Sequence, residues 1–165
     1  MPGRQRGRQE KATGESEIDL RAVQGCTCMH LRRTTRRVTQ LYDRRLAPAG
    51  ITAGQFSLLG RLYGAKLQGQ DALSIGALAE QHGMDPTTLN RNLKPLLSAG
   101  LVRDGLDPTD RRVRTVSLTD AGRRRLASAM PLWREAQQYV ESVLGAEATL
   151  ALNGLLDLSA TKLTT

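Results

Sequence analysis

The sequence is poor in aromatic residues, in cysteine and in long apolar runs. These shortages argue against an aromatic core, a disulfide framework and a membrane span. Phe, Trp and Tyr make up only 3% of the 165 residues, so a core must consist mainly of Leu, Val, Ile and Ala. Apolar residues still form 39% of the chain, which is enough to fold. The two cysteines, Cys26 and Cys28, are separated by one residue and do not make a disulfide framework.

Sequence signals for membranes, enzymes and metals are also missing. No apolar run could span a membrane, and the polar N-terminus has no signal-peptide core, so we expect a cytoplasmic protein without a membrane partner. There is no P-loop, GxGxxG, nucleophile elbow or HExxH, so neither an enzyme nor a cofactor is expected. Cys26, Cys28 and His30 form a C-x-C-x-H, but only Cys26 and His30 would share a helix face, so no metal site is expected.

Positive charge is what the sequence has in excess. The net charge of +8 favours a polyanionic partner. Residues 28–50 hold six basic residues and one acidic residue, and residues 85–125 hold nine basic and five acidic residues. Residues 126–165 instead hold two basic and four acidic residues. Two basic blocks are typical of a nucleic-acid footprint, although a solvated surface can give the same numbers.

The N-terminal part divides into an arm and two predicted helices. Residues 1–17 have almost no apolar content, which predicts a flexible basic arm, either inert or in contact with DNA. Residues 18–47 have a helical apolar period that ends before Pro48. A shorter helix follows within residues 51–65, with Thr52 as its N-cap, and residues 66–72 form a loop.

Residues 73–100 predict a helix-turn-helix. Ser74 is placed to cap a short helix, Gly83 stands at its C′ position, and Asp85 and Pro86 start a new helix. Two short helices joined by a tight glycine-containing turn make this motif.

The second of these helices has the features of a recognition helix. Its buried face contains Leu89, Leu93 and either Leu96 or Leu97, and Pro95 is expected to bend it. The residues predicted to face a DNA major groove, where they can bond base edges and phosphates, are Thr87, Thr88, Asn90, Arg91 and Lys94.

A β-hairpin, or wing, is predicted next. Residues 101–103 and 115–118 are short strands, and the segment between them holds Arg111, Arg112 and, just before the second strand, Arg114. A wing lies over the DNA backbone and can push an arginine into the minor groove. Asp107 and Asp110 are expected to brace the hairpin by pairing with its arginines.

This order of elements resembles the MarR family of winged-helix regulators over nearly the whole chain beyond the arm. The most specific element is Asp110-Arg111-Arg112, followed by the LTDAG of residues 118–122. The resemblance implies a mostly α fold with a small β-hairpin wing. A winged helix-turn-helix lobe would span about residues 52–125, and dimerisation helices would span about 18–47 and 126–163. Apart from the resemblance, Pro131 is expected to kink or interrupt the first of the closing helices. In the family, the arginine at the position of Arg112 enters the minor groove.

The resemblance also implies a function. The chain would be a sequence-specific DNA-binding transcriptional regulator, expected to be a repressor that binds a palindromic double-stranded DNA operator as a homodimer. A small-molecule or oxidant signal would release it. A dimer is physically reasonable because two recognition helices read two half-sites. The alternative is a constitutive architectural DNA-binding protein without an effector.

Two kinds of signal remain open. In the branch of the family that senses organic hydroperoxides, a reactive cysteine starts the first helix and a tyrosine follows it, and Cys28 and Tyr42 stand at comparable positions, with Cys26 as an added thiol. Nearby arginines favour a thiolate, but the interpretation that we favour from the sequence is that Cys28 is a small buried hydrophobe in the dimer region. The family otherwise binds small aromatic or lipophilic acids between the dimer region and the lobe, where candidate lining residues are His30, Tyr42, Phe56 and Trp133.

Overall fold

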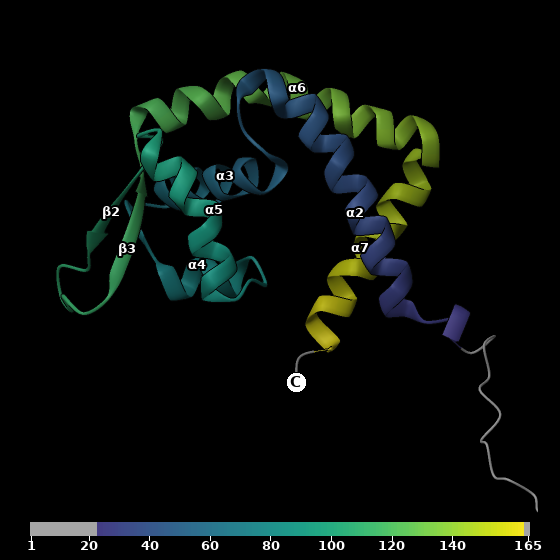
Figure 1. Ribbon diagram of the computed structural model, residues 1–165, viewed down its shortest axis with the longest axis horizontal. Helices are drawn as coiled ribbons and strands as arrows, with labels where there is room; N and C mark the ends of the chain where they lie inside the picture. Colours follow the sequence, from purple (N-terminus) through teal and green to yellow (C-terminus); the bar gives the residue numbers. More distant parts are fainter. Residues whose placement is uncertain (1–22, 164–165) are drawn as a thin grey trace, which may run out of the picture. The chain divides into compact units, whose positions relative to one another are not determined.

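The structure is a computed structural model that describes residues 23–163, so the predicted arm at 1–17 lies outside the described residues. The chain divides into two compact units, Met1–Arg36 and Arg37–Thr165. The helices are α2 (Thr27–Leu46), α3 (Ala53–Leu67), α4 (Ile75–Gln81), α5 (Pro86–Ser98), α6 (Asp120–Leu144) and α7 (Ala146–Lys162), with a single 3-10 turn at Ala47–Ala49 (Figure 1). This mostly helical chain with a small sheet confirms the predicted fold class.

The start of α3 is fixed by local hydrogen bonds and by the end of α2. The Thr52 hydroxyl accepts a hydrogen bond from the Gln55 amide, and the Gln55 side chain accepts one from the Thr52 amide, which makes a capping box. The Asp43 carboxylate on α2 accepts a bond of 2.7 Å from the amide of Ala53. The predicted cap at Thr52 is confirmed, and Asp43 ties the last turns of α2 to the first turn of α3.

The two helices of the predicted helix-turn-helix are confirmed. The Ser74 hydroxyl accepts from the amide of Ala77 and caps α4. Gly83 follows α4 with a φ of 57°, a left-handed conformation that favours glycine. The Asp85 carboxylate then accepts bonds of 2.9 Å from the amides of Thr87 and Thr88 and caps α5.

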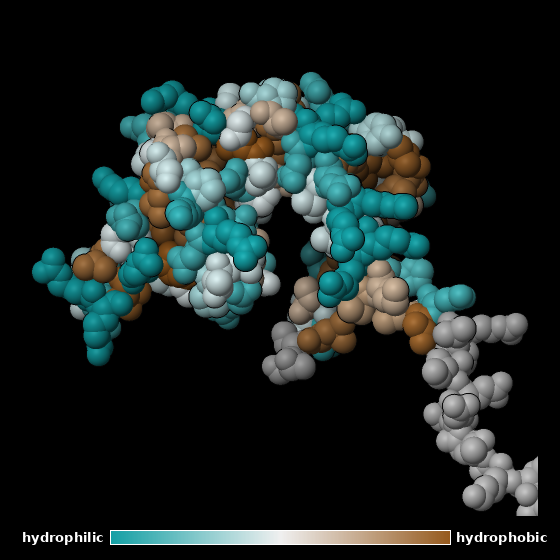
Figure 2. Space-filling view, viewed as in Figure 1, coloured by the Kyte–Doolittle hydropathy of each residue, from teal (hydrophilic) through white to brown (hydrophobic). Residues whose placement is uncertain are grey.

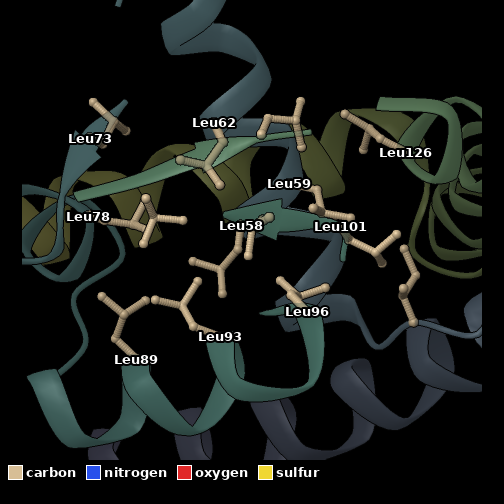
Figure 3. Close-up of a cluster of buried hydrophobic side chains, with 14 of the residues drawn as sticks. Leu58, Leu59, Leu62, Leu73, Leu78, Leu89, Leu93, Leu96, Leu101 and Leu126 are labelled. Atoms are coloured by element: carbon tan, nitrogen blue, oxygen red, sulfur yellow. The ribbon is translucent and has the colours of Figure 1, made fainter. Parts of the chain in front are cut away.

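Leucines from α3, α4 and α5 fill the centre of the lobe. Leu58 on α3, Leu78 on α4 and Leu89 on α5 are all fully buried, and their side chains point toward one another in Figure 3. The choice left open between Leu96 and Leu97 is settled, because Leu96 is 1% exposed and Leu97 only packs against the rim. Pro95 stands on the exposed side of α5, and the helix continues past it.

The sheet has one strand more than the predicted hairpin. Strand β2 (Val102–Leu106) pairs antiparallel with β3 (Arg114–Leu118), and β3 also pairs with β1, which consists only of Leu73 and Ser74. The strands of the wing extend further toward its tip than the sequence indicated. Strand β1 joins the loop before α4 to the wing, so that the hairpin is anchored on the helix-turn-helix.

The helix α6 begins at a crowded junction with the sheet. The Thr119 hydroxyl accepts a bond from the Gly122 amide and lies within bonding distance of the Gly100 and Leu101 carbonyls, at 2.7 and 3.0 Å. The helix then runs through Pro131 to Leu144, so the chain is not interrupted there. Between residues 23 and 163, none of the helices has the length and apolarity needed to cross a membrane.

Gly122 provides a test of this junction. A Cβ at Gly122 would lie 2.0 Å from the Leu101 carbonyl oxygen, whereas one at Gly76 in α4 would meet no atom within 4 Å. We expect Gly122→Ala to lower the free energy of unfolding by about 1–3 kcal/mol or more, because backbone has to move. Gly76→Ala should leave it unchanged or raise it by about 0.5–1 kcal/mol. Urea unfolding compares the two, and equal midpoints would show that the junction is not tight.

Candidate nucleic-acid interface

The exposed face of α5 is set by its leucines. Because Leu89, Leu93 and Leu96 point into the core, the opposite side of the helix is left to solvent. All five residues predicted to face a major groove are exposed on α5: Thr87, Thr88, Asn90, Arg91 and Lys94.

These side chains differ in whether they form hydrogen bonds with other residues of the chain. The Thr88 hydroxyl donates a bond of 2.6 Å to the Asp85 carboxylate, so it belongs to the helix cap. That bond and those from the backbone lower the pKa of Asp85, which keeps the cap charged. Within residues 23–163, the side chains of Thr87, Asn90, Arg91 and Lys94 form no hydrogen bond or ion pair. Thr87 and Arg91 are therefore better placed than Thr88 to bind a partner.

The wing holds one arginine in a fixed position. The Arg112 guanidinium donates two bonds of 3.1 Å to the two oxygens of Asp110, and the Arg112 backbone amide donates a third bond of 3.0 Å to that carboxylate. The Arg112 side chain nevertheless remains 91% exposed. The pKa of Asp110 is lowered mainly by the bond from the Arg112 side chain, so the pair stays charged. The predicted brace at Asp110 is present.

The second predicted brace is wrong. Asp107 does not pair with an arginine of the wing; its carboxylate accepts bonds from the amides of Thr109 and Asp110 and stabilises the turn itself. These bonds, that of the Thr109 hydroxyl first, lower the pKa of Asp107. Arg114, on β3, pairs instead with Asp104, on β2, at 3.8 Å, diagonally across the two strands. An aspartate carboxylate can either accept bonds from nearby backbone amides and form a turn, or pair with an arginine. For Asp107 the backbone bonds prevail.

Two further features of the wing were not singled out in the sequence. Arg103 is exposed on β2, where it lies opposite Ser117 of β3. The sequence placed it in a predicted strand but did not indicate that it would belong to the interface. Leu106, near the tip, is 53% exposed, although it is apolar. In Figure 2 the wing shows some apolar surface, in brown, among hydrophilic side chains, in teal. The tip therefore exposes both positively charged side chains and a small apolar surface.

The candidate thiols lie in the first unit. The helix α2 begins at Thr27, so the predicted helix over 18–47 does not continue through Cys26, which precedes the first turn. Cys28 lies within that turn and is exposed in the single chain, not buried. His30 bonds the Gln24 carbonyl oxygen at 3.1 Å. The break before Thr27 removes the constraint that a regular helix would place on a bond between the two sulfur atoms.

The other candidate pocket residues lie in the second unit and contact the core. The Tyr42 hydroxyl donates a bond of 2.7 Å to the Gln137 side chain, and burial, followed by the charge of Glu141, raises the pKa of Tyr42. Phe56 and Trp133 stack on each other with ring centroids 5.9 Å apart. Each of these three rings already has a partner, and His30 belongs to the other unit.

Comparison with known proteins identifies the fold and its relatives. The chain matches no protein-family model. It is similar to the transcriptional regulator MosR of M. tuberculosis, with 34% identity, a TM-score of 0.69, and coverage of 85% of this chain and 98% of MosR. MosR has also been crystallised with DNA.

Two other relatives agree. A mutant of MarR from E. coli, crystallised with operator DNA, is 25% identical with a TM-score of 0.72, over 85% of this chain and 97% of that one. The HTH-type transcriptional regulator YdgJ of Bacillus subtilis is 33% identical over 98 residues, which are 59% of this chain and only 55% of YdgJ. Together with the winged helix-turn-helix, these similarities show that the chain belongs to the MarR family of transcriptional regulators.

Proposed function

We propose that the chain is a sequence-specific DNA-binding regulator that represses transcription by occupying a palindromic operator as a homodimer. The observation that carries this proposal is the combination, in one lobe, of an exposed polar face on α5 and a neighbouring wing whose Arg112 is clamped by Asp110 yet exposed. An α-helix fits the major groove, and an extended arginine fits the minor groove beside it. The DNA complexes of MosR and E. coli MarR support the same assignment.

Within this proposal, some residues of α5 recognise bases, and others bind phosphates or hold the helix in place. Thr87, Asn90 and Arg91 read base edges, because their side chains are exposed and unoccupied in the described chain. Lys94, further along α5, contacts phosphates. Thr88 holds the cap of α5 through Asp85 and contributes mainly structure.

The wing supplies the second set of contacts. Arg112 enters the minor groove, and Asp110 sets its direction while leaving it exposed. Arg111 and Arg114 contact the flanking phosphates. Positive charge at all three positions gives an affinity that falls as salt rises.

The homodimer is supported by apolar surface that a single chain leaves uncovered. On α7, Leu150 is 76% exposed and Leu155 is 62% exposed, and Val143 at the end of α6 is 62% exposed. Figure 2 shows apolar surface, in brown, around the end of α6. Water-exposed leucines in such number mark an interaction site. We assign α2, α6 and α7 to the dimerisation region and the segment from about 52 to 125 to the DNA-binding lobe.

Oxidation of the N-terminal thiols is the signal that the geometry favours over a small aromatic or lipophilic acid. Cys28 is exposed in the first turn of α2, and Cys26 precedes the helix. The Cys28 thiolate attacks an organic hydroperoxide, gives a sulfenic acid and releases the alcohol. The thiol of Cys26 or of a partner subunit then displaces water to form a disulfide. The candidate acid-binding residues Tyr42, Phe56 and Trp133 are instead occupied by contacts within the chain.

A binding-site selection on random DNA tests the function itself. The wild type should return two inverted half-sites about 10 base pairs apart, as expected for two recognition helices in one dimer. Arg91→Ala and Thr87→Ala should change the preferred base at particular positions. Thr88→Ser, which keeps the bond to Asp85, should keep the consensus. Uniform recovery of unrelated sequences would instead favour the constitutive architectural protein.

The role of the Arg112–Asp110 pair is tested by substituting each residue in turn. Arg112→Ala should weaken operator binding by about 1–3 kcal/mol at fixed salt, the scale of one good nucleic-acid contact. Asp110→Asn should weaken binding as well, although it removes a negative charge, because it releases the guanidinium from its fixed position. A purely electrostatic wing would give the opposite sign for Asp110→Asn, and tighter binding would refute the clamp. Circular dichroism of both variants checks that they fold.

Titration with an organic hydroperoxide tests the thiol signal. Operator binding by the wild type should be lost on oxidation and restored by a dithiol reductant, whereas Cys28→Ser should stay bound. Cys26→Ser should still react, and it should accumulate the sulfenic acid if Cys26 is the resolving thiol or form a disulfide between subunits if Cys28 of the partner subunit is. Mass spectrometry with a sulfenic-acid trap distinguishes the two. If Cys28→Ser loses operator binding at the same peroxide concentration as the wild type, Cys28 is not the sensor.

A further inference from the structure

A polar groove of about 320 Å³ lies on the outward side of α3, within the lobe that holds the helix-turn-helix. Residues of α3, of the turn and strand that follow it, and of the end of α4 form its walls. None of the four residues considered above for an effector pocket lines it. Its volume is that of a site for a small molecule.

Two glycines that line the groove are not required by close packing within the described chain. Gly60 and Gly64 lie four residues apart in the interior of α3, where glycine weakens a helix relative to alanine. A Cβ added at either position would meet no atom within 4 Å. Packing inside the lobe therefore does not require them, in contrast to Gly122. Bare helix backbone at this place is useful to a molecule that approaches α3 from outside.

The side chains around these glycines carry one positive charge and several neutral polar groups. Arg61 is exposed between them, and no acidic residue lines the groove. The Ser57 hydroxyl and the amides of Gln68 and Gln81 surround the same space. The turn after α3 is fixed, because the amides of Gln68 and Gln70 both donate bonds of 3.0 Å to the Ala65 carbonyl. The groove is thus already shaped in the unliganded chain.

This set of groups specifies a ligand class. A single guanidinium matches a single carboxylate through two parallel hydrogen bonds, whereas a phosphate dianion calls for more positive charge. Amide and hydroxyl groups match the hydroxyls of a hydrophilic body, and a polar wall disfavours an aromatic one. We propose that the groove binds a small polyhydroxy carboxylate such as a sugar acid, with Arg61 holding the carboxylate and the backbone at Gly60 and Gly64 carrying the body of the ligand.

The neighbourhood of His82 supplies an independent reporter of binding. The His82 Nε2 atom is buried and has no hydrogen-bond partner in the described part of the chain. Burial lowers the pKa of His82 first, and the nearby charge of Arg61 lowers it further. A carboxylate on Arg61 offsets that positive charge, so the pKa of His82 should rise when the ligand binds. Arg61→Gln should raise it without ligand.

The experiment is a titration of the isotope-labelled full chain with gluconate, followed by nuclear magnetic resonance in the absence of DNA. We expect saturable shifts at the amides of Arg61, Gly64 and Gln81, and a rise in the pKa of His82. Sorbitol, which has the same chain of hydroxyls but no carboxylate, should cause neither. Arg61→Gln should weaken gluconate binding about tenfold or more, since a charged pair is lost. Lys66→Gln removes an exposed cation on α3 outside the groove and should leave binding unchanged.

A glycine variant separates binding from folding. Gly64→Ala should raise the thermal midpoint, because alanine favours the helix and meets no neighbour, yet weaken gluconate binding by covering the backbone. Gly76→Ala, in α4, adds the same methyl group away from the groove and should not change binding. A variant that is more stable and binds less cannot be explained by loss of structure.

Three results would overturn the proposal. Equal binding of sorbitol and gluconate would remove the role of the carboxylate. Stronger binding of inorganic phosphate than of gluconate, at equal ionic strength, would assign the groove to phosphate. Absence of gluconate shifts, together with self-association that Gly64→Ala abolishes, would show that a helix of a second chain packs on these glycines. None of these measurements involves an operator, so they stand apart from the test of DNA binding.

Discussion

The burial of leucine on one side of α5 is the constraint on which the rest of the lobe depends. With so few aromatic residues, the core relies on leucines such as Leu58, Leu78 and Leu89 interlocking across three short helices. Once Leu89, Leu93 and Leu96 point inward, the rotation of α5 is fixed, because any other rotation would expose them to water. The residues proposed to read DNA are therefore aimed by the hydrophobic effect, and not by any contact of their own.

Polar interactions act within this frame at short range. Asp85 caps α5, Asp107 closes the turn of the wing, and Asp110 holds Arg112, each through bonds to residues two or three positions away. The pKa values of all three aspartates are lowered by these bonds. Their stabilising effect is complete above the pKa of an aspartate in the unfolded chain and is lost as the pH falls through the lower pKa values of the folded chain. Acid below the pKa of an aspartate in the unfolded chain should thus weaken both the cap of α5 and the turn of the wing.

The same distinction between local and distant interactions explains how much the sequence could predict. Caps at Thr52, Ser74 and Asp85 were found because their hydrogen bonds join residues close in the chain, and the leucine period revealed the buried side of α5. Strand β1 was missed because two residues carry no periodicity and are a strand only by pairing with β3. Asp107 was assigned to the wrong partner because sequence cannot rank a backbone amide against an arginine. The groove at Arg61 combines three separate segments, so no linear pattern could have indicated it.

The groove also lies next to the turn that leads into α5. It contains Gln81, the last residue of α4, and His82 and Gly83 lead from there into the cap of α5. A ligand that bridges Arg61 on α3 and Gln81 on α4 would favour whichever arrangement of these helices binds it better. Since a ligand shifts an equilibrium only by its difference in affinity between two states, the effect on DNA binding depends on how far the turn at Gly83 changes the direction of α5. The leucine core resists such a change, so any change of direction has to take place in residues 82–85, which connect the two helices.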